Sequence, residues 1–244
     1  MAEQISTRQS EQLESAIIHM RDQGLDQLPD DTVNFLLQTF HSTLQDWKLL
    51  NAYYRGALME VRTKFDVLNE QFSVEYDRNP IESIETRIKS LESLFEKMQR
   101  TNCPLSLEGI EEHISDFAGI RVICSFIDDV YLLADCLERQ DDIRVLRVKD
   151  YIKNPKPNGY RSLHIIVEVP IFLHDEKRWM KVEVQLRTIA MNFWASLEHK
   201  MRYKKDVDPA SAERLGKELL RSAETSHRLD LHMQEIRREL ERMP

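Results

Sequence analysis

The segment KVEVQLR, residues 181–187, alternates polar and apolar side chains in a way that could place chemistry on one face of a strand. Successive side chains of an extended strand point to opposite faces, so every second residue shares a face. The apolar set is Val182, Val184 and Leu186, and the polar set is Lys181, Glu183, Gln185 and Arg187. This pattern predicts a strand with one buried face and one face able to act on a charged ligand.

Three other segments with the same alternation carry polar side chains of similar kinds. These segments are IESIETRIKS with Arg87 and Lys89, AGIRVICSF with Arg121, and RSLHIIVEV with His164. If these strands form one sheet, the polar side chains line one side of it. The alternative is the solvent-facing side of an ordinary antiparallel sheet, which mixes charges in the same way. A basic, glycine-containing loop before the His164 strand and Asp116 before the Arg121 strand favour a site.

Phosphate chemistry fits this set of side chains. A triphosphate carries about four negative charges, so its site needs Mg²⁺ held by one or two carboxylates and several cations around the phosphates. Arginine suits the task because its planar fork matches phosphate oxygens or stacks on adenine, and a purine also needs an aromatic platform. The candidates are Asp116 and Glu183 for Mg²⁺, Arg87, Lys89 and Arg121 for phosphates or adenine, and Tyr160 beside Gly159 for a purine.

Positive charge is concentrated in one segment of an acidic chain. The sequence has 244 residues, 41% of them hydrophobic, and a formal net charge of −8. Residues 144–161, RVLRVKDYIKNPKPNGYR, hold six lysines and arginines against the single acid Asp150. A solvated basic loop is the ordinary interpretation, and a phosphate-binding loop is the one that the neighbouring segments favour. The net charge argues against general nucleic-acid binding, which needs a broad excess of Lys and Arg.

The sequence predicts a cytoplasmic protein. No stretch approaches the ~18 consecutive apolar residues of a membrane span, and the N-terminal MAEQISTRQSEQLES lacks the basic start and apolar core of a signal peptide. The cysteines, Cys103, Cys124 and Cys136, are far apart and include no C-x-x-C pair. This spacing favours buried reduced thiols over a metal site.

Helical patterns begin and end the chain. Residues 1–78 carry apolar residues at helical spacing, which predicts a helical N-terminal region with successive helices over the runs 13–20, 36–47 and 49–72. Residues 206–244 contain an amphipathic helix after Pro209. The apolar face of this helix must cover a surface of its own domain or of another subunit, and the sequence allows both.

Strands and helices alternate over residues 79–205, which we expect to form the chemical domain. The segment KNPKPNG, 153–159, contains two prolines and an Asn-Gly pair and is expected to be a loop. This alternation predicts an α/β fold class with about five strands. The expected strands are 84–88, 118–126, 142–148, 161–169 and 178–187.

Five segments resemble those of a known family: TRIKS, SDFAGIRV, KDYIKNPKPNGYRSLH, VEVQLRT and AMNFWASLEH. Their order and approximate spacing resemble the synthetase domain of RelA/SpoT-type (p)ppGpp synthetases, in particular the stand-alone small alarmone synthetases. The resemblance covers about half of the chain, and five ordered segments make chance agreement very improbable. It implies a mixed sheet flanked by helices, distantly like that of the nucleotidyltransferases, which agrees with the alternation above.

The resemblance also implies roles for matching residues. Glu183 and Asp116 would share Mg²⁺, and Glu183 would act near the acceptor's 3′-hydroxyl as a general base. Tyr160 would stack on guanine. The ATP-binding residues would be Arg87, Lys89 and Arg121, with Arg121 also in the catalytic set. The other acceptor-binding residues would be Lys149, Lys153, Lys156, Gly159, His164, Gln185, Arg187 and Asn192. The simpler alternatives are an ion-paired Glu183, a hydrogen-bonded His164 and a surface Asn192.

The implied activity is transfer of pyrophosphate from ATP to the 3′-hydroxyl of GDP or GTP, with GMP as a further acceptor. The products are AMP and (p)ppGpp, the alarmone of the stringent response. Hydrolase activity is not expected, because the only His-Asp pair, His174-Asp175, lies in a predicted hairpin without partner residues. By analogy with the family we expect a homotetramer, which an alarmone effector could regulate.

Three other functions are compatible with parts of the pattern. One is a toxin-like tRNA 3′-end pyrophosphokinase, which the net charge of −8 disfavours. Another is an enzyme that prefers adenine nucleotides. The third is a non-catalytic sensor of alarmone or RNA, which is disfavoured because Asp116 and Glu183 are both present.

Overall fold

The computed structural model describes residues 30–76, 78–104, 106–202 and 208–243. Contacts divide the chain into two compact units, residues 1–49 and 50–244. The apolar runs 36–47 and 49–72, expected as successive helices, belong to the single long helix α2 (Asp30–Tyr76), because no helix-breaking residue separates them. The run 13–20 lies outside the described residues. The division of the chain at 78 and 205 stays a prediction.

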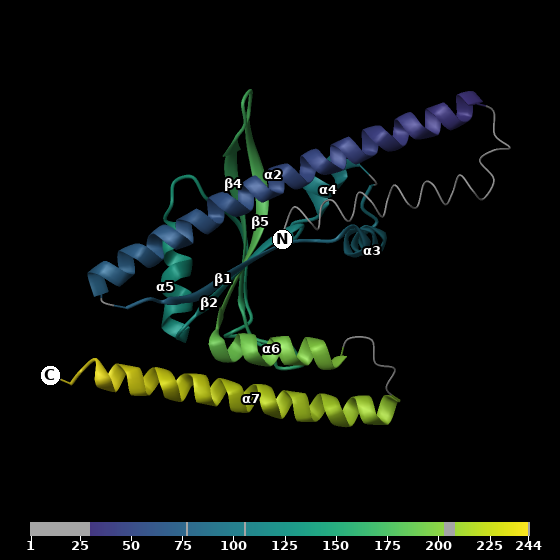
Figure 1. Ribbon diagram of the computed structural model, residues 1–244. Coiled ribbons are helices and arrows are strands. Elements are labelled where there is room, and N and C mark those ends of the chain that lie inside the picture. Colours follow the sequence, from purple (N-terminus) through teal and green to yellow (C-terminus); the bar gives the residue numbers. More distant parts are fainter. Residues whose placement is uncertain (1–29, 77, 105, 203–207, 244) are drawn as a thin grey trace. The chain divides into compact units, whose positions relative to one another are not determined.

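After α2 the chain alternates between strands and helices, as expected (Figure 1). The elements are β1 (Ile81–Ile88), α3 (Leu91–Thr101), α4 (Leu107–His113), β2 (Ala118–Cys124), α5 (Ile127–Glu138), β3 (Arg144–Asp150), β4 (Leu163–Phe172), β5 (Lys177–Thr188), α6 (Ile189–Arg202) and α7 (Pro209–Leu240).

Local sequence explains where three of the helices begin. Ser90, Ser106 and Asp208 precede α3, α4 and α7, and a side-chain oxygen of each accepts a hydrogen bond from a backbone N–H of the first turn. Such caps satisfy donors that have no partner within the helix. Pro209 begins α7, where its missing N–H costs nothing and its fixed φ suits a helix.

The five strands form one mixed sheet in the order β1-β2-β5-β4-β3. β2 runs parallel to β5, and the other neighbouring pairs are antiparallel. β4 and β5 form the expected hairpin, and the KNPKPNG segment is the expected loop between β3 and β4. The predicted fold class is confirmed: a mixed five-stranded sheet flanked by helices.

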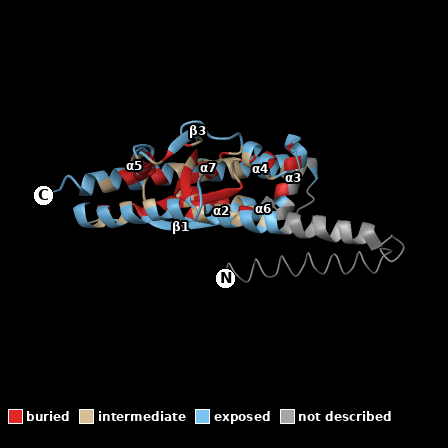
Figure 2. Cartoon of the chain, turned by 90° about the horizontal axis from the view of Figure 1, so that it is seen from above, coloured by how far each residue is buried: buried red, intermediate tan, exposed pale blue. Residues whose placement is uncertain are grey.

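One face of the sheet is apolar and buried, as Figure 2 shows for the strands at the centre. Within residues 50–244, α2 covers this face, since a Cβ built on Gly56 would lie 3.7 Å from Cγ2 of Ile171. The ring centroids of Tyr54 and Phe117 are 4.4 Å apart at one edge of the same core. The fully buried side chains of this face include Ile120, Val122, Ile165, Val167, Val182, Val184 and Leu186.

Helix α7 packs on its own domain, which answers a question that the sequence left open. It lies beside α6 (Figure 1). Thr188 at the end of β5 donates a 2.6 Å hydrogen bond to the buried carboxyl of Asp230. Near the C-terminal end of α7, Arg237 lies 3.1 Å from Asp128 at the start of α5. Polar contacts therefore hold α7 at several points along its length.

The cysteines are free thiols, as expected. Cys103 and Cys124 are buried, whereas Cys136 is only half-buried because it lies near the end of a surface helix. Burial raises the pKa of Cys124 far above its ordinary value, and nearby Asp129 raises it further. In the described part of the chain, no helix is both long and apolar enough to cross a membrane.

Candidate active site

The polar face of the sheet carries an unbroken row of polar side chains across all five strands. The strand registers pair Glu85 with Arg121, Arg121 with Gln185, Gln185 with His164, and His164 with Lys149. Neighbouring strands lie about 4.8 Å apart, so adjacent members of the row are within reach of one another. Folding thus brings together residues from four of the predicted polar segments and the basic strand β3.

Five side chains on this face form a closed ring of hydrogen bonds. Glu183 contacts Nδ1 of His164 at 3.0 Å, and Nε2 of His164 lies 2.8 Å from the hydroxyl of Tyr160. Arg187 donates to that hydroxyl at 2.5 Å and to Oε1 of Gln185 at 2.9 Å. Gln185 closes the ring by donating to the other oxygen of Glu183 at 2.8 Å. Every member was predicted as a site residue.

The ring keeps Glu183 ionised. Burial would raise the pKa of Glu183, but hydrogen bonds from His164 and Gln185 and the charge of Arg87 outweigh it and lower that pKa to about 2. A carboxylate that accepts several hydrogen bonds is stabilised in its charged form. Burial lowers the pKa of Arg187, while Tyr160 and Glu183 offset part of this effect. The site therefore holds a fixed anion beside fixed donors.

The arginines predicted to bind ATP lie side by side on β1 and β2. Arg87 and Arg121 line one pocket of about 100 Å³ together with Glu85 and Gln185. Arg121 donates to Glu85 at 3.0 Å. A Cβ built on Gly119 would lie 3.6 Å from Cγ and Nε of Arg87, so the absent side chain lets Arg87 extend over β2 toward Glu183.

Asp116 lies in the turn before β2 and faces two lysines. Lys89 is 3.3 Å from Oδ2 of Asp116, and Lys97 of α3 pairs with Oδ1. Among the described residues no group of three or more His, Cys, Asp or Glu side chains could hold a metal. Mg²⁺, however, is usually held by only one or two carboxylates together with substrate phosphates. Asp116, before β2, and Glu183, on β5, each have cations nearby, and carboxylates in such surroundings suit that mode of binding.

Tyr160, a member of the hydrogen-bonded ring, lies in the loop before β4. Gly159 adopts a φ of +87°, which glycine tolerates and other residues rarely adopt. Lys156 lies over two rings, 4.6 Å from the centroid of Tyr160 and 4.8 Å from that of Tyr151. The rings of Tyr151 and His164 meet edge to face at 5.2 Å. Aromatic rings and a lysine therefore surround the position predicted for a purine.

Not every predicted residue joins this cluster. Lys153 contacts Asp150 at 3.6 Å and the ring of Tyr131 at 4.8 Å instead of the Tyr160 ring. Lys149 stands opposite His164 in the strand register and is exposed. Asn192, in the first turn of α6, has a buried Oδ1 without a hydrogen-bond partner in the described part of the chain.

Sequence reasoning missed three residues of the site. Lys97 lies on an amphipathic helix, where its pattern indicates only a solvated face. Tyr151 stands between Lys149 and Lys153, just before the predicted loop, and could have been found as a second aromatic near Tyr160. Gly119 carries no side chain, and only the register with Arg87 reveals its role.

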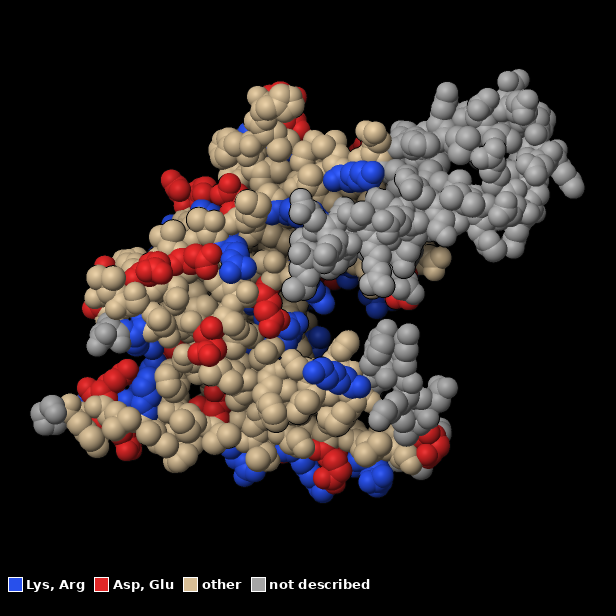
Figure 3. Space-filling view, in the orientation of Figure 1, with Lys and Arg blue, Asp and Glu red and all other residues tan. Residues whose placement is uncertain are grey.

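Charges of both signs are interspersed over the face drawn in Figure 3, without a broad area of Lys and Arg. The cations of the site lie instead on the polar face of the sheet, in the adjoining loop and, for Lys97, on α3. Cations gathered around two carboxylates and an aromatic loop suit a ligand that combines phosphates with a base. Fold and site together define a nucleotide-binding domain of the phosphate-transferring class.

Comparisons with known proteins specify this class. A family model described as the region found in RelA / SpoT proteins matches residues 86–208. GTP pyrophosphokinase YwaC of Bacillus subtilis is 44% identical over 200 residues, which is 82% of this chain and 94% of that protein. The chain therefore belongs to the RelA/SpoT family, as the sequence segments indicated.

Solved structures of relatives share the fold. The small alarmone synthetase 1 of Bacillus subtilis bound to its product pppGpp has a TM-score of 0.71 and 36% identity, covering 79% of this chain and 97% of that one. The same synthetase bound to AMPCPP has a TM-score of 0.67 and 31% identity, covering 82% of this chain and all of that one, at 100%.

Proposed function

We propose that this protein transfers pyrophosphate from ATP to the 3′-hydroxyl of GDP or GTP, with GMP as a further acceptor, and so makes (p)ppGpp. The observation that carries the proposal is the hydrogen-bonded ring, which joins Glu183 to Tyr160 and borders the pocket of Arg87 and Arg121 through Gln185. An anion at the reacting centre thus lies between a cationic pocket and an aromatic loop. The relatives bound to AMPCPP and to pppGpp support adenine and guanine nucleotides as ligands.

The donor would lie over β1 and β2. Arg87 and Arg121 would bind the adenine or the phosphates of ATP, since guanidinium groups both stack on rings and pair with phosphate oxygens. Lys89 and Lys97 now neutralise Asp116. In the complex, their ammonium groups would turn to the phosphates. This assignment extends the predicted ATP-binding set by one residue, Lys97.

We assign Mg²⁺ to Asp116 and Glu183. When bound, Mg²⁺ would offset the charge of the phosphates and of the transition state. The low pKa of Glu183 means that its carboxylate is ionised without the help of a metal. The acceptor's guanine would stack on Tyr160, and its 5′-phosphates would meet Lys156 and Lys149. His164 and Asn192 would help to place the acceptor.

The reaction forms one P–O bond and breaks another. The 3′-hydroxyl oxygen of the acceptor attacks the β-phosphorus of ATP, the bond from that phosphorus to the oxygen bridging to the α-phosphate breaks, and AMP leaves with the bridging oxygen. Glu183 orients the 3′-hydroxyl, and the hydroxyl proton passes to solvent. An efficient base has a pKa near the working pH, so a pKa of about 2 favours Glu183 as an orienting group more than as a base.

We expect synthesis without hydrolysis from the described domain. His174 and Asp175, 3.3 Å apart, lie in the connection between β4 and β5, with 92% and 66% of their side chains exposed. We further propose a cytoplasmic homo-oligomer, a tetramer by analogy, with an alarmone effector. Exposed apolar side chains support self-association: Ile189 and Phe193 on α6, and Leu229 and Met233 on α7.

The test is an assay with Mg²⁺, ATP labelled in its terminal phosphates, and separately GMP, GDP, GTP or tRNA. Label on a guanine nucleotide with release of AMP is expected. Glu183→Gln should lower kcat by at least about 100-fold, whereas Glu168→Gln, a carboxylate of β4 outside the ring, should keep it. Label only on tRNA would assign the tRNA-modifying activity, and nucleotide binding without transfer would favour a sensor.

A further inference from the structure

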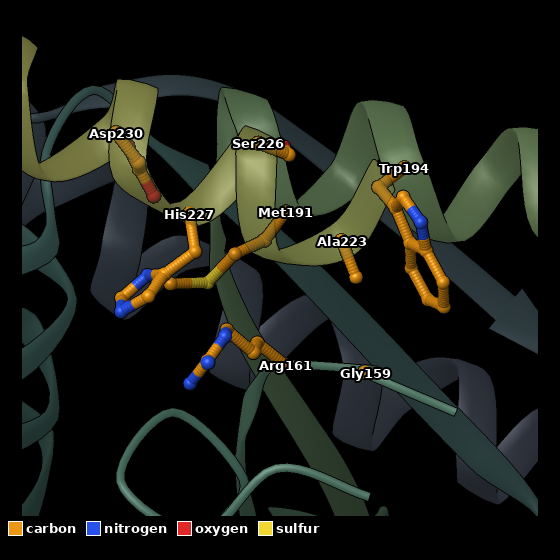
Figure 4. Close-up of a pocket in the computed structure, with 8 residues that line it drawn as sticks. All are labelled: Gly159, Arg161, Met191, Trp194, Ala223, Ser226, His227 and Asp230. Carbon is orange, nitrogen blue, oxygen red and sulfur yellow. The ribbon is translucent and has the colours of Figure 1, made fainter. Parts of the chain in front are cut away.

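Helix α7 lies against the loop that carries Tyr160. A Cβ built on Gly159 would lie 2.5 Å from Cβ of Ala223 and 3.1 Å from Cδ1 of Leu220, which leaves no space for a side chain between loop and helix. Figure 4 shows Ala223 pointing at the backbone of Gly159, with Trp194 of α6 on one side. The helix thus touches the loop at the residue next to Tyr160.

The same helix supports the ring of Tyr160. Trp194, Ala195 and Ala223 form a small buried cluster, and Tyr160 and Leu219 pack against it. Trp194 donates a 3.0 Å hydrogen bond from its ring nitrogen to the carbonyl of Leu219. The aromatic side chain of Tyr160 therefore packs against residues of α6 and α7. Its hydroxyl belongs to the hydrogen-bonded ring on the sheet.

The support is itself fixed to the sheet. Ser226 donates to the carbonyl of Ala190 in α6 at 3.1 Å, and Asp230 accepts from Thr188 of β5. Farther along, Gln234 accepts a 2.9 Å hydrogen bond from the backbone N–H of Asp128. These contacts tie α7 to β5, α6 and α5. A larger side chain at position 223 would therefore displace the loop more easily than the helix.

We propose that α7 sets the position of the acceptor-binding loop, with Ala223 as its positioning residue, so that the size of this side chain controls affinity for the acceptor nucleotide and leaves the donor unaffected. The inference rests on the proposed function for the identity of the acceptor. The donor pocket of Arg87 and Arg121 includes no residue of α7. All of α7, Pro209–Leu240, also lies beyond the matched family region, 86–208, so nothing in that match assigns the role.

The experiment compares the full chain with Ala223→Leu and with Ala212→Leu, the same change at an exposed position of α7. KM for GDP, KM for ATP and kcat are measured, together with Kd for GDP by calorimetry. Ala223→Leu should raise KM and Kd for GDP at least about 10-fold, since misplacing a binding group by 1 Å can cost about 100-fold. KM for ATP should change less than about twofold, and Ala212→Leu should match the wild type.

A partly unfolded variant would lose kcat in proportion to the folded fraction and keep both KM values, so it cannot imitate the expected result. If Ala223→Leu does not fold, Ala223→Ser should show a smaller shift of KM and Kd for GDP in the same direction. Unchanged GDP affinity in a folded Ala223 variant, or an equal rise of both KM values, would overturn the proposal.

The two proposals fail in different ways. A wild-type chain that binds GDP but transfers nothing would overturn only the proposed function. The ratio of the Kd for GDP of the Ala223 variant to that of the wild type would still decide the role of α7. A wild-type chain that binds no guanine nucleotide would overturn both.

Discussion

The side chains of the ring depend on one another for charge and for hydrogen bonds. Arg187 is 5% exposed and Gln185 8%, so each needs partners inside the protein. Ser162, fully buried, lies 3.3 Å from Nε of Arg187 and donates to the carbonyl of Leu186. Arg187 is a buried cation with three hydrogen-bond partners, Ser162, Tyr160 and Gln185, and leaving it partly unpaired is costly. The ring is therefore a structural feature as well as a chemical one.

The change Tyr160→Phe tests how much the hydrogen-bonded ring contributes to stability. The change keeps the aromatic ring but removes the hydroxyl that accepts from Arg187 and contacts His164. The free energy of unfolding should fall by about 1–3 kcal/mol, because a buried charged donor loses an acceptor. Urea denaturation measures the loss, with the exposed Tyr76→Phe as matched control. A variant as stable as the wild type would show that Arg187 does not depend on this hydroxyl.

At the scale of elements, α7 joins the sheet through a carboxyl group that is costly to ionise. Burial raises the pKa of Asp230 to about 6, and the hydrogen bond from Thr188 lowers it only in part. The same Thr188 oxygen accepts the backbone N–H of Met191 in the first turn of α6. One small polar contact thus links β5, α6 and α7.

The stability of the protein should depend on pH through Asp230. Below about pH 4 the carboxyl is protonated in both states and costs nothing. As the pH rises from about 4 to about 6, the unfolded state ionises while the folded state keeps its proton, so stability falls, and above about pH 6 the full cost of burying the charge is present. Asp230→Asn removes the charge and keeps an acceptor for Thr188. Relative to the wild type it should gain on the order of 2 kcal/mol between pH 4 and pH 7.

Denaturant titrations at several pH values between 4 and 7 measure this difference, and Asp141→Asn on an exposed loop is the matched control. Equal pH profiles for wild type and Asp230→Asn would show that the Asp230 carboxyl is solvated in the folded protein.

At the scale of the whole molecule, folding does not depend on the metal that the proposed chemistry needs. Asp116 already faces Lys89 and Lys97, and Glu183 faces His164 and Gln185. Neither carboxylate is left as an unpaired charge that only Mg²⁺ could offset. The charge of both carboxylates is thus balanced by side chains of the chain itself.

Removing Mg²⁺ should therefore abolish transfer and leave the fold intact. With excess EDTA, pyrophosphate transfer should stop and Tm should change by less than about 2 °C, which corresponds to under about 1 kcal/mol in a protein of this size. Circular dichroism during heating measures Tm, and added Mg²⁺ should restore activity. A large drop in Tm with EDTA would show that a bound metal contributes to folding.

Local sequence was enough to predict which residues share a face, the five strands and most of the helices, although it divided α2 and missed α4. Alternation in KVEVQLR and AGIRVICSF separates Glu183, Gln185 and Arg121 from the apolar core because side-chain direction follows from backbone geometry. The five ordered family segments and the loop with two prolines were also predicted from the sequence. These features are local, and local sequence fixes them.

Only the tertiary structure decided how these faces meet. The parallel pairing of β2 with β5 places Arg121 beside Gln185, although 64 positions separate them, and no local pattern encodes that register. The pairing of Lys97 with Asp116 and the contact of Ala223 with Gly159 likewise depend on packing between different elements of the chain. Strand order and helix docking are set by burial of the whole core, so they appear only when the chain is folded.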